Sequence, residues 1–178
     1  MASNIGKVFE QQIKKSVPEY ALAYRLQDST GSFGGSNLRF SNKNPFDFLI
    51  WDSKRRILYA LELKSVSGRS ISFERSKEER GEIHYHQIQG LLEWSKYDWT
   101  VCGLLIEFRE AETTIFLDVG EFMRLSDSIS KKSFNLKDLA SYRHVVVPQT
   151  KHRTRYTYDI EYLLSASSTD MDLKEEII

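Results

Sequence analysis

The stretch NPFDFLIWDSKRRILYALELKS, residues 44–65, contains two apolar runs separated by a polar turn. The runs FDFLIW and ILYALELK are short and rich in aromatic and branched residues, so we predict two antiparallel strands joined as a hairpin through DSKRR. Asp47 stands near the start of the first run, and Glu62 and Lys64 stand near the end of the second. Because burying charged side chains is costly, these three residues are the first candidates for a functional role.

The alternation of side chains along a strand places Glu62 and Lys64 on the same face. Leu61 and Leu63 then point to the opposite face, into the core. The turn also predicts the pairing of the two strands. If the hairpin is centred between residues 54 and 55, residue numbers across it sum to 109, because 54 + 55 = 109.

This register brings Asp47 opposite Glu62. Two ionised carboxylates directly opposite one another destabilise a sheet. The conflict is removed if one acid keeps its proton or if a cation lies between the two. Oxygen ligands without a neighbouring cysteine favour a hard ion, so we expect Mg²⁺, with Mn²⁺ as a possible substitute.

A site of this composition suits the hydrolysis of phosphodiester bonds. Mg²⁺ is commonly held by one or two carboxylates, and substrate phosphate oxygens and waters complete its shell. A lysine on the same face, Lys64, is placed to stabilise negative charge that develops during the reaction. The structural alternative is that Asp47 caps a turn and that Glu62 and Lys64 form an exposed pair on an edge strand.

The rest of the chain indicates a single α/β domain over residues 1–164, with a mixed central sheet flanked by helices. Residues 27–43 are rich in Gly, Ser and Asn and are predicted to form a flexible loop, and residues 165–178 a frayed polar tail. Periodicity and turn residues predict helices at 5–17, 83–97, 121–125, 135–141 and 159–164, and strands at 20–26, 99–108, 113–119 and HVVVP.

Composition limits the classes of function. The single cysteine, Cys102, lies in an apolar segment and excludes a disulfide framework or a Cys-rich zinc site. No apolar run is long enough to span a membrane, and the N-terminus does not resemble a signal peptide, so we expect a cytoplasmic protein without a membrane partner. The formal net charge is zero, which taken alone argues against a protein coated in nucleic acid.

The distribution of charge nevertheless points to a basic surface. Between residues 130 and 155 basic residues far outnumber acidic ones, and the balance reverses after residue 159. Such asymmetry is typical of a surface that contacts phosphates, although the same lysines and arginines would also serve as ordinary solvated surface. The candidate DNA-binding residues are Arg39, Arg69, Arg75, Lys77, Lys151, Arg153 and Arg155.

Asp47 followed after a hairpin-length gap by Glu62-Leu63-Lys64 resembles the PD-(D/E)XK signature of restriction-endonuclease-like nucleases. A predicted helix bearing His86-Gln87 follows, and this order is similar to that of RecU-type Holliday-junction resolvases. In that family the Asp, Glu and Gln bind the metal and the Lys stabilises the transition state. The resemblance therefore implies the catalytic residues Asp47, Glu62, Lys64 and Gln87, with Asp47, Glu62 and Gln87 as metal ligands, and Glu10 as a further catalytic residue near the metal.

The resemblance also implies a substrate and an assembly. It predicts a metal-dependent endonuclease that cleaves four-way DNA junctions as a homodimer. The chain departs from the family pattern at Pro45, where the family has Thr, and at residues 27–43, which replace the family's projecting stalk. Two alternatives stay open: a general nuclease, or one specific for branched or foreign DNA, of the same superfamily, and a DNA-binding module without activity.

Overall fold

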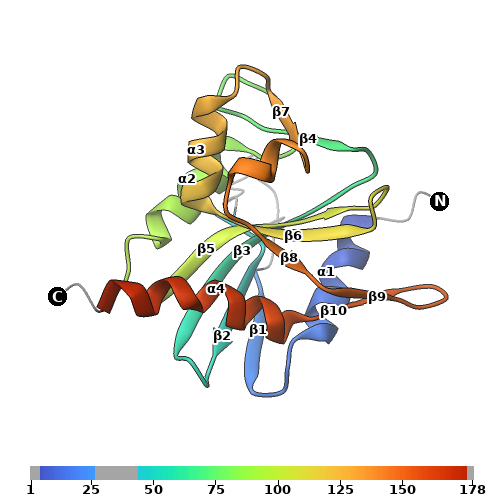
Figure 1. Ribbon diagram of the computed structural model, residues 1–178, viewed down its shortest axis with the longest axis vertical. Coiled ribbons are helices and arrows are strands. Elements are labelled where there is room, and N and C mark those ends of the chain that lie inside the picture. The colour runs from blue at the N-terminus through green and yellow to red at the C-terminus, as the bar shows by residue number, and fades with distance from the viewer. Residues whose placement is uncertain (1–4, 27–43, 176–178) are drawn as a thin grey trace, which may run out of the picture.

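A computed structural model describes residues 5–26 and 44–175, with side chains up to residue 168 (Figure 1). The predicted loop at 27–43, including Arg39, lies outside the described residues. Six strands form the central sheet, in the order β1-β2-β3-β5-β6-β8. These are β1 (Ala21–Arg25), β2 (Phe48–Asp52), β3 (Ile57–Val66), β5 (Thr100–Phe108), β6 (Thr113–Asp118) and β8 (Val145–Val147).

The sheet is mixed, because β3 and β5 run parallel while the other neighbouring strands are antiparallel. Strands β3 and β5 lie in the middle and are buried on both faces, which is why their sequences are almost continuously apolar. Helices flank the sheet: α1 (Ile5–Ser16), α2 (Tyr85–Trp94), α3 (Val119–Ser128) and α4 (Ile160–Glu175). The predicted α/β fold, a mixed central sheet flanked by helices, is confirmed.

The sheet separates two hydrophobic cores. One core contains the buried side chains of α2 and α3, such as Ile88 and Phe122. The other contains those of α1 and α4, such as Phe9 and Leu163, together with Leu61 of β3. A residue of β3 therefore enters one core or the other according to its position in the strand, and this alternation decides which side chains face α2.

The hairpin of β2 and β3 has the predicted register. Phe48 pairs with Leu61 and Asp52 with Ile57, so the paired residue numbers sum to 109. The regular pairing ends at Phe48 and Leu61. The backbone N–H of Asp47 donates to the carbonyl of the same Leu61 at 3.1 Å, so the ladder is offset by one residue at Asp47. The carboxylate of Asp52 closes the turn by accepting from two backbone N–H groups within it.

Two further two-stranded sheets lie beside the central one and were not predicted. They pair β4 (Ser70–Ser72) with β7 (Ser133–Asn135) and β9 (Gln149–Lys151) with β10 (Tyr156–Tyr158). The helix expected at 135–141 is instead the end of β7 followed by a short 3-10 helix, η1 (Asp138–Ser141). The structure also extends α3 by several residues beyond the predicted 121–125.

The C-terminal segment differs from the prediction. Residues 165–175 continue α4 instead of forming a frayed tail. Serine hydroxyls in this segment bond to carbonyls of the same helix: Ser167 donates to Leu163 and Ser168 to Ser165. The helix is also held by Tyr59, whose hydroxyl donates to the carbonyl of Leu164 at 2.8 Å. No helix in the described part of the chain is both long and apolar enough to cross a bilayer.

Candidate active site

The carboxylate of Asp47 is fixed by the neighbouring strand. Asp47 directly precedes β2, and its Oδ2 accepts a hydrogen bond from the backbone N–H of Leu63 at 3.0 Å. Leu63 follows Glu62 in β3, so this bond holds the two acids at the same level of the hairpin. Asp47 and Glu62 therefore lie close enough to interact, and the bond from Leu63 to the Asp47 side chain, rather than direct pairing in the ladder, brings them together.

Glu62 is almost completely enclosed, with 1% of its surface exposed. Its Oε1 accepts from Lys64 Nζ at 2.9 Å and from Gln87 Nε2 at 2.5 Å. Its Oε2 is buried and has no hydrogen-bond partner among the described residues. A buried carboxylate oxygen without a donor is costly, so this atom calls for a proton or a cation.

The electrostatics of the pair agree with that requirement. Burial, followed by the negative charge of Asp47, raises the pKa of Glu62 to about 8, against the opposing effect of Lys64. Burial also raises the pKa of Asp47 above its ordinary value, although the N–H of Leu63 and the charge of Lys64 lower it. Without a cation, Glu62 therefore keeps its proton at neutral pH.

Lys64 shares the face of Glu62, as the alternation predicts. Its side chain is 18% exposed, so the ammonium group touches both the buried carboxylate and the surface. Leu61 and Leu63 lie in the opposite core. Because β3 is a central strand, the alternative in which Glu62 and Lys64 form an exposed pair on an edge strand is wrong.

Gln87 contacts Glu62, but with the end of its amide that cannot bind a metal. Its Oε1 accepts the backbone N–H of His84 at 2.9 Å in a capping box at the start of α2. Its Nε2 therefore faces Glu62, which sits across from the first turn of the helix. In this arrangement Gln87 orients the Glu62 carboxylate, and the expected metal-ligand role of its side-chain oxygen does not fit the geometry.

Glu10 lies on α1 and forms an ion pair with Arg25 of β1. Sequence reasoning missed Arg25, whose place near Asp47 follows from the pairing of Arg25 with Phe48. The negative charge of Glu10 raises the pKa of Asp47, and the positive charge of Arg25 lowers it, after the larger effects of burial and of the Leu63 bond. Glu10 thus acts on the acid pair electrostatically, while its own carboxylate is held by Arg25.

The side chains at the acid pair suit a hard divalent ion better than zinc. The described residues contain no group of three or more His, Cys, Asp or Glu side chains arranged for a metal. A zinc site needs such a group, whereas Mg²⁺ is commonly held by one or two carboxylates. Asp47 and the partnerless Oε2 of Glu62 fit the second case. Cys102 is no alternative nucleophile, because burial raises the pKa of its thiol to about 12.

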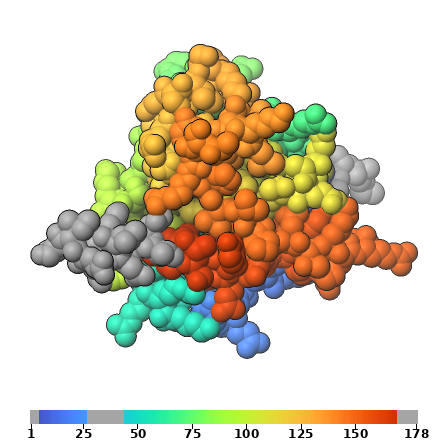
Figure 2. All heavy atoms as spheres, in the orientation of Figure 1, coloured from blue at the N-terminus to red at the C-terminus, as the bar shows by residue number. Residues whose placement is uncertain are grey.

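The candidate DNA-binding residues fall into two regions. Arg69 and Lys77 are exposed in the segment between β3 and α2, where Arg69 pairs with Glu110 at 2.7 Å. Lys151, Arg153 and Arg155 lie on the hairpin of β9 and β10, which extends beyond the body of the molecule (Figure 2). In this hairpin Lys151 forms an ion pair with Glu112, and Arg153 and Arg155 are exposed.

Arg75 has a different environment from the other candidates. Its guanidinium donates to the carbonyls of Ser126, Ile129 and Lys131, at the end of α3 and just beyond it. It also lies over the ring of Phe73, 4.8 Å from its centroid. Carbonyls at a helix C-terminus lack partners within the helix, so this arginine satisfies them. Its geometry is that of a structural residue, and we leave it out of the proposed DNA contacts.

This assignment predicts a difference between two arginines. Arg75→Ala should lower the free energy of unfolding by about 2–3 kcal/mol, because a charged donor to several carbonyls is lost. Arg69→Ala, which removes an exposed ion pair, should change it by less than about 0.5 kcal/mol. Urea denaturation of both variants measures the difference. Equal effects would contradict the structural role of Arg75.

The raised pKa of Glu62 predicts how stability depends on pH in the absence of metal. Since its pKa in the folded state is about 8 and its ordinary value is 4.5, the unfolded chain loses this proton first as pH rises. The contribution of Glu62 to the free energy of unfolding should therefore fall between these two values, by up to about 1.4 kcal/mol per pH unit. Glu62→Gln should remove this fall. Urea denaturation in EDTA, at several pH values, compares the two proteins, and parallel pH profiles would contradict a protonated Glu62.

The geometry can be set beside known proteins. No family model matches the chain. It is similar to the SPbeta prophage-derived uncharacterized protein YotM of Bacillus subtilis (strain 168), with 32% identity over 139 residues that make up 78% of this chain and 65% of that protein. The chain thus spans somewhat less than two thirds of this relative. Among solved structures it is similar to Archaeoglobus fulgidus Hjc, a Holliday junction resolvase from an archaeal hyperthermophile, with a TM-score of 0.41 and 12% identity over 69% of this chain and 81% of that one.

Proposed function

We propose that this protein is a Mg²⁺-dependent DNA endonuclease of the restriction-endonuclease-like class, acting in the cytoplasm on branched DNA and above all on four-way junctions. One observation supports this most: Glu62 is buried beside Asp47 with one oxygen unpartnered, and Lys64 lies on the same face. A proton or a cation would satisfy this oxygen, and we assign a cation to it.

Each side chain then has a distinct task. Asp47 and Oε2 of Glu62 would hold Mg²⁺, which when bound supplies Lewis-acid chemistry that activates water and neutralises charge on the phosphate. Gln87 and Leu63 N–H keep the two carboxylates in place. Lys64 contacts the buried acid and is partly exposed, so it stabilises the negative charge that develops on the phosphate oxygens.

The preference for four-way junctions comes from the resemblance of the Asp47 and Glu62-Leu63-Lys64 pattern to resolvases. A junction is two-fold symmetric and needs two cuts. One protomer offers a single acid pair, so we propose that a homodimer acts on it. Manganese, which accepts the same oxygen ligands, should replace magnesium in this site.

The test compares substrates and metals. The protein is incubated with a synthetic four-way junction or with a linear duplex of the same sequence, in Mg²⁺ or in EDTA, and Asp47→Ala is run in parallel. Paired symmetric cuts in the junction alone, dependent on Mg²⁺ and on Asp47, are the expected result. Cutting of both substrates would indicate a nuclease of broader specificity. Binding of DNA without any cutting in Mg²⁺ would indicate a DNA-binding module.

A further inference from the structure

A groove of about 300 Å³ lies between α1 and the strand β10, away from the acid pair. From α1 it is lined by Val8, Gln11, Gln12 and Lys15, and from the hairpin by Arg155 and Tyr156. Figure 1 shows α1 beside the hairpin of β9 and β10. The contact between α1 and β10 brings together residues from near the two ends of the chain. The groove is therefore built by tertiary structure and is not visible in the sequence.

The groove brings together two cations and no acidic side chain. No acidic residue lines it, and within residues 5–26 and 44–175 neither Lys15 nor Arg155 forms an ion pair. Ten other basic residues in this part of the chain do: Arg25, Lys54, Arg55, Lys64, Arg69, Lys96, Arg124, Lys131, Lys132 and Lys151. In a chain of zero net charge, two uncompensated cations facing one groove indicate an anionic ligand.

The remaining lining specifies the kind of anion. Two amide side chains, Gln11 and Gln12, supply polar groups, and Tyr156 offers an aromatic ring. Val8 is 41% exposed and gives an apolar wall. Sites that bind a nucleic-acid strand combine cations and amides, which contact phosphates, with aromatic and apolar surface, which contacts sugars and bases.

The groove is held rigidly relative to the strand that carries Glu62 and Lys64. The hydroxyl of Tyr158, in β10, donates to Oε1 of the buried Glu107 at 2.9 Å. Oε2 of the same carboxylate accepts from Ser65, the residue after Lys64, at 2.5 Å. The backbone N–H of Tyr158 donates to the hydroxyl of Ser16 in α1 at 3.1 Å. These bonds tie the groove to β3 on the face of the sheet that carries α1 and α4, whereas Glu62 and Lys64 point to the other face.

Helix α1 connects the groove with the acid pair. Glu10, which influences Asp47, and Lys15 lie on different flanks of this helix, about 8 Å apart along its axis. Lys14 lies exposed beside them. None of the residues that line the groove belongs to the acid pair, so the groove lies outside the cleavage position.

We propose that the groove between α1 and β10 binds the phosphate backbone of the DNA substrate outside the cleavage position, with Lys15 and Arg155 as the phosphate contacts. This inference deepens the proposed function and rests on its substrate being DNA. It separates the tasks of the two regions: the acid pair performs the chemistry, while the groove adds affinity and places the strand.

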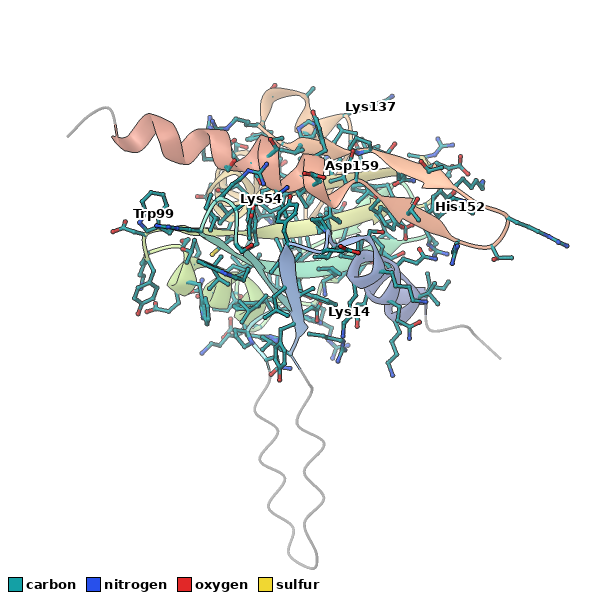
Figure 3. The ribbon with its side chains drawn as sticks, turned by 90° about the horizontal axis from the view of Figure 1, so that it is seen from below. Lys14, Lys54, Trp99, Lys137, His152 and Asp159 are labelled. Atoms are coloured by element: carbon teal, nitrogen blue, oxygen red, sulfur yellow. The ribbon has the colours of Figure 1, made fainter. Side chains whose placement is uncertain are left out.

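The test measures binding apart from cleavage. The affinity of the double variant Lys15→Ala/Arg155→Ala for a fluorescent four-way junction is determined by anisotropy in EDTA over a range of NaCl concentrations. Its affinity should be lower by about tenfold or more near 0.1 M salt, and the slope of log K against log salt should be shallower by about two, because two phosphate contacts are lost. Lys137→Ala, an exposed lysine on another part of the surface (Figure 3), is the control and should match the wild type.

The outcomes distinguish this inference from the proposed function. If the wild type cuts DNA and the double variant keeps wild-type affinity and salt slope, the groove is no DNA site, and the nuclease proposal stands. If no metal supports cutting but the double variant loses affinity, the groove proposal stands and the nuclease proposal fails. Inorganic phosphate is also added as a competitor in the anisotropy measurement. If phosphate binds the wild type but does not displace DNA, the groove proposal is overturned, because the groove is then an anion site unrelated to the substrate.

Discussion

Glu62→Gln should reduce the rate of Mg²⁺-dependent strand cleavage by at least about 10³-fold, which corresponds to about 4 kcal/mol of transition-state stabilisation. Glutamine keeps the shape of the side chain and can still accept from Lys64 and Gln87 at Oε1. What it removes is the charge on the buried, partnerless oxygen. Single-turnover cleavage of a junction, with protein in excess over DNA, measures the effect on the chemical step.

The controls separate lost chemistry from lost folding or binding. Glu62→Gln should bind DNA in EDTA at least as tightly as the wild type, since a negative charge near the phosphates is removed. Glu93→Gln, which changes an exposed acid of α2 paired with Lys96, should cleave at the wild-type rate. Wild-type cleavage by Glu62→Gln would show that Glu62 holds no catalytic metal.

Gly90→Ala should lower cleavage by about 10²-fold with a modest loss of stability. A Cβ at Gly90 would lie 2.9 Å from the carbonyl oxygen of Pro45 and even closer to its ring, so helix α2 has to move away. Gly90 lies one turn after Gln87, and Pro45 is two residues before Asp47. The displacement therefore pulls Gln87 from Glu62 and disturbs both acids.

Two opposing terms decide the stability of Gly90→Ala. Alanine favours the helix by about 1 kcal/mol, whereas overpacking costs about 1–3 kcal/mol, so the net change lies between about zero and a loss of about 2 kcal/mol. Gly68→Ala is the matched control, because a Cβ there meets nothing within 4 Å. Unchanged cleavage by Gly90→Ala, measured beside Gly68→Ala, would contradict the positioning role of α2.

The sequence sufficed for the hairpin because local rules determine it. A polar turn between two apolar runs leaves few registers, and the one summing to 109 centres the turn on DSKRR. The faces of Glu62 and Lys64 follow from the alternation alone. Those predictions are confirmed in the structure, and the metal and DNA assigned to the site stay predictions.

Side-chain roles that depend on distant backbone were not predictable. Gln87 was expected to bind metal, but the N–H of His84 occupies its oxygen in a capping box. Arg75 was expected on the DNA-binding surface, but its guanidinium donates to carbonyls more than fifty positions away in the sequence. In both cases a local motif and a tertiary contact compete for one side chain, and only coordinates show which contact forms.

The smaller sheets were missed for a related reason. The strands β4 and β7 have three residues each and lie far apart in the chain, and β9 and β10 flank a polar, basic turn without alternation. Such segments carry no periodic signal and become strands only because a partner is nearby. The groove beside β10 was invisible for the same reason, since its two walls come from opposite ends of the sequence.

The most direct test of the account is to locate a bound cation. Crystals of the protein soaked in Mn²⁺ and measured at the manganese absorption edge would show the ion by its anomalous signal. The account predicts one site, contacting Oε2 of Glu62 and the carboxylate of Asp47, that disappears in Glu62→Gln. A manganese ion bound elsewhere, or none near Glu62 at millimolar concentrations, would contradict it.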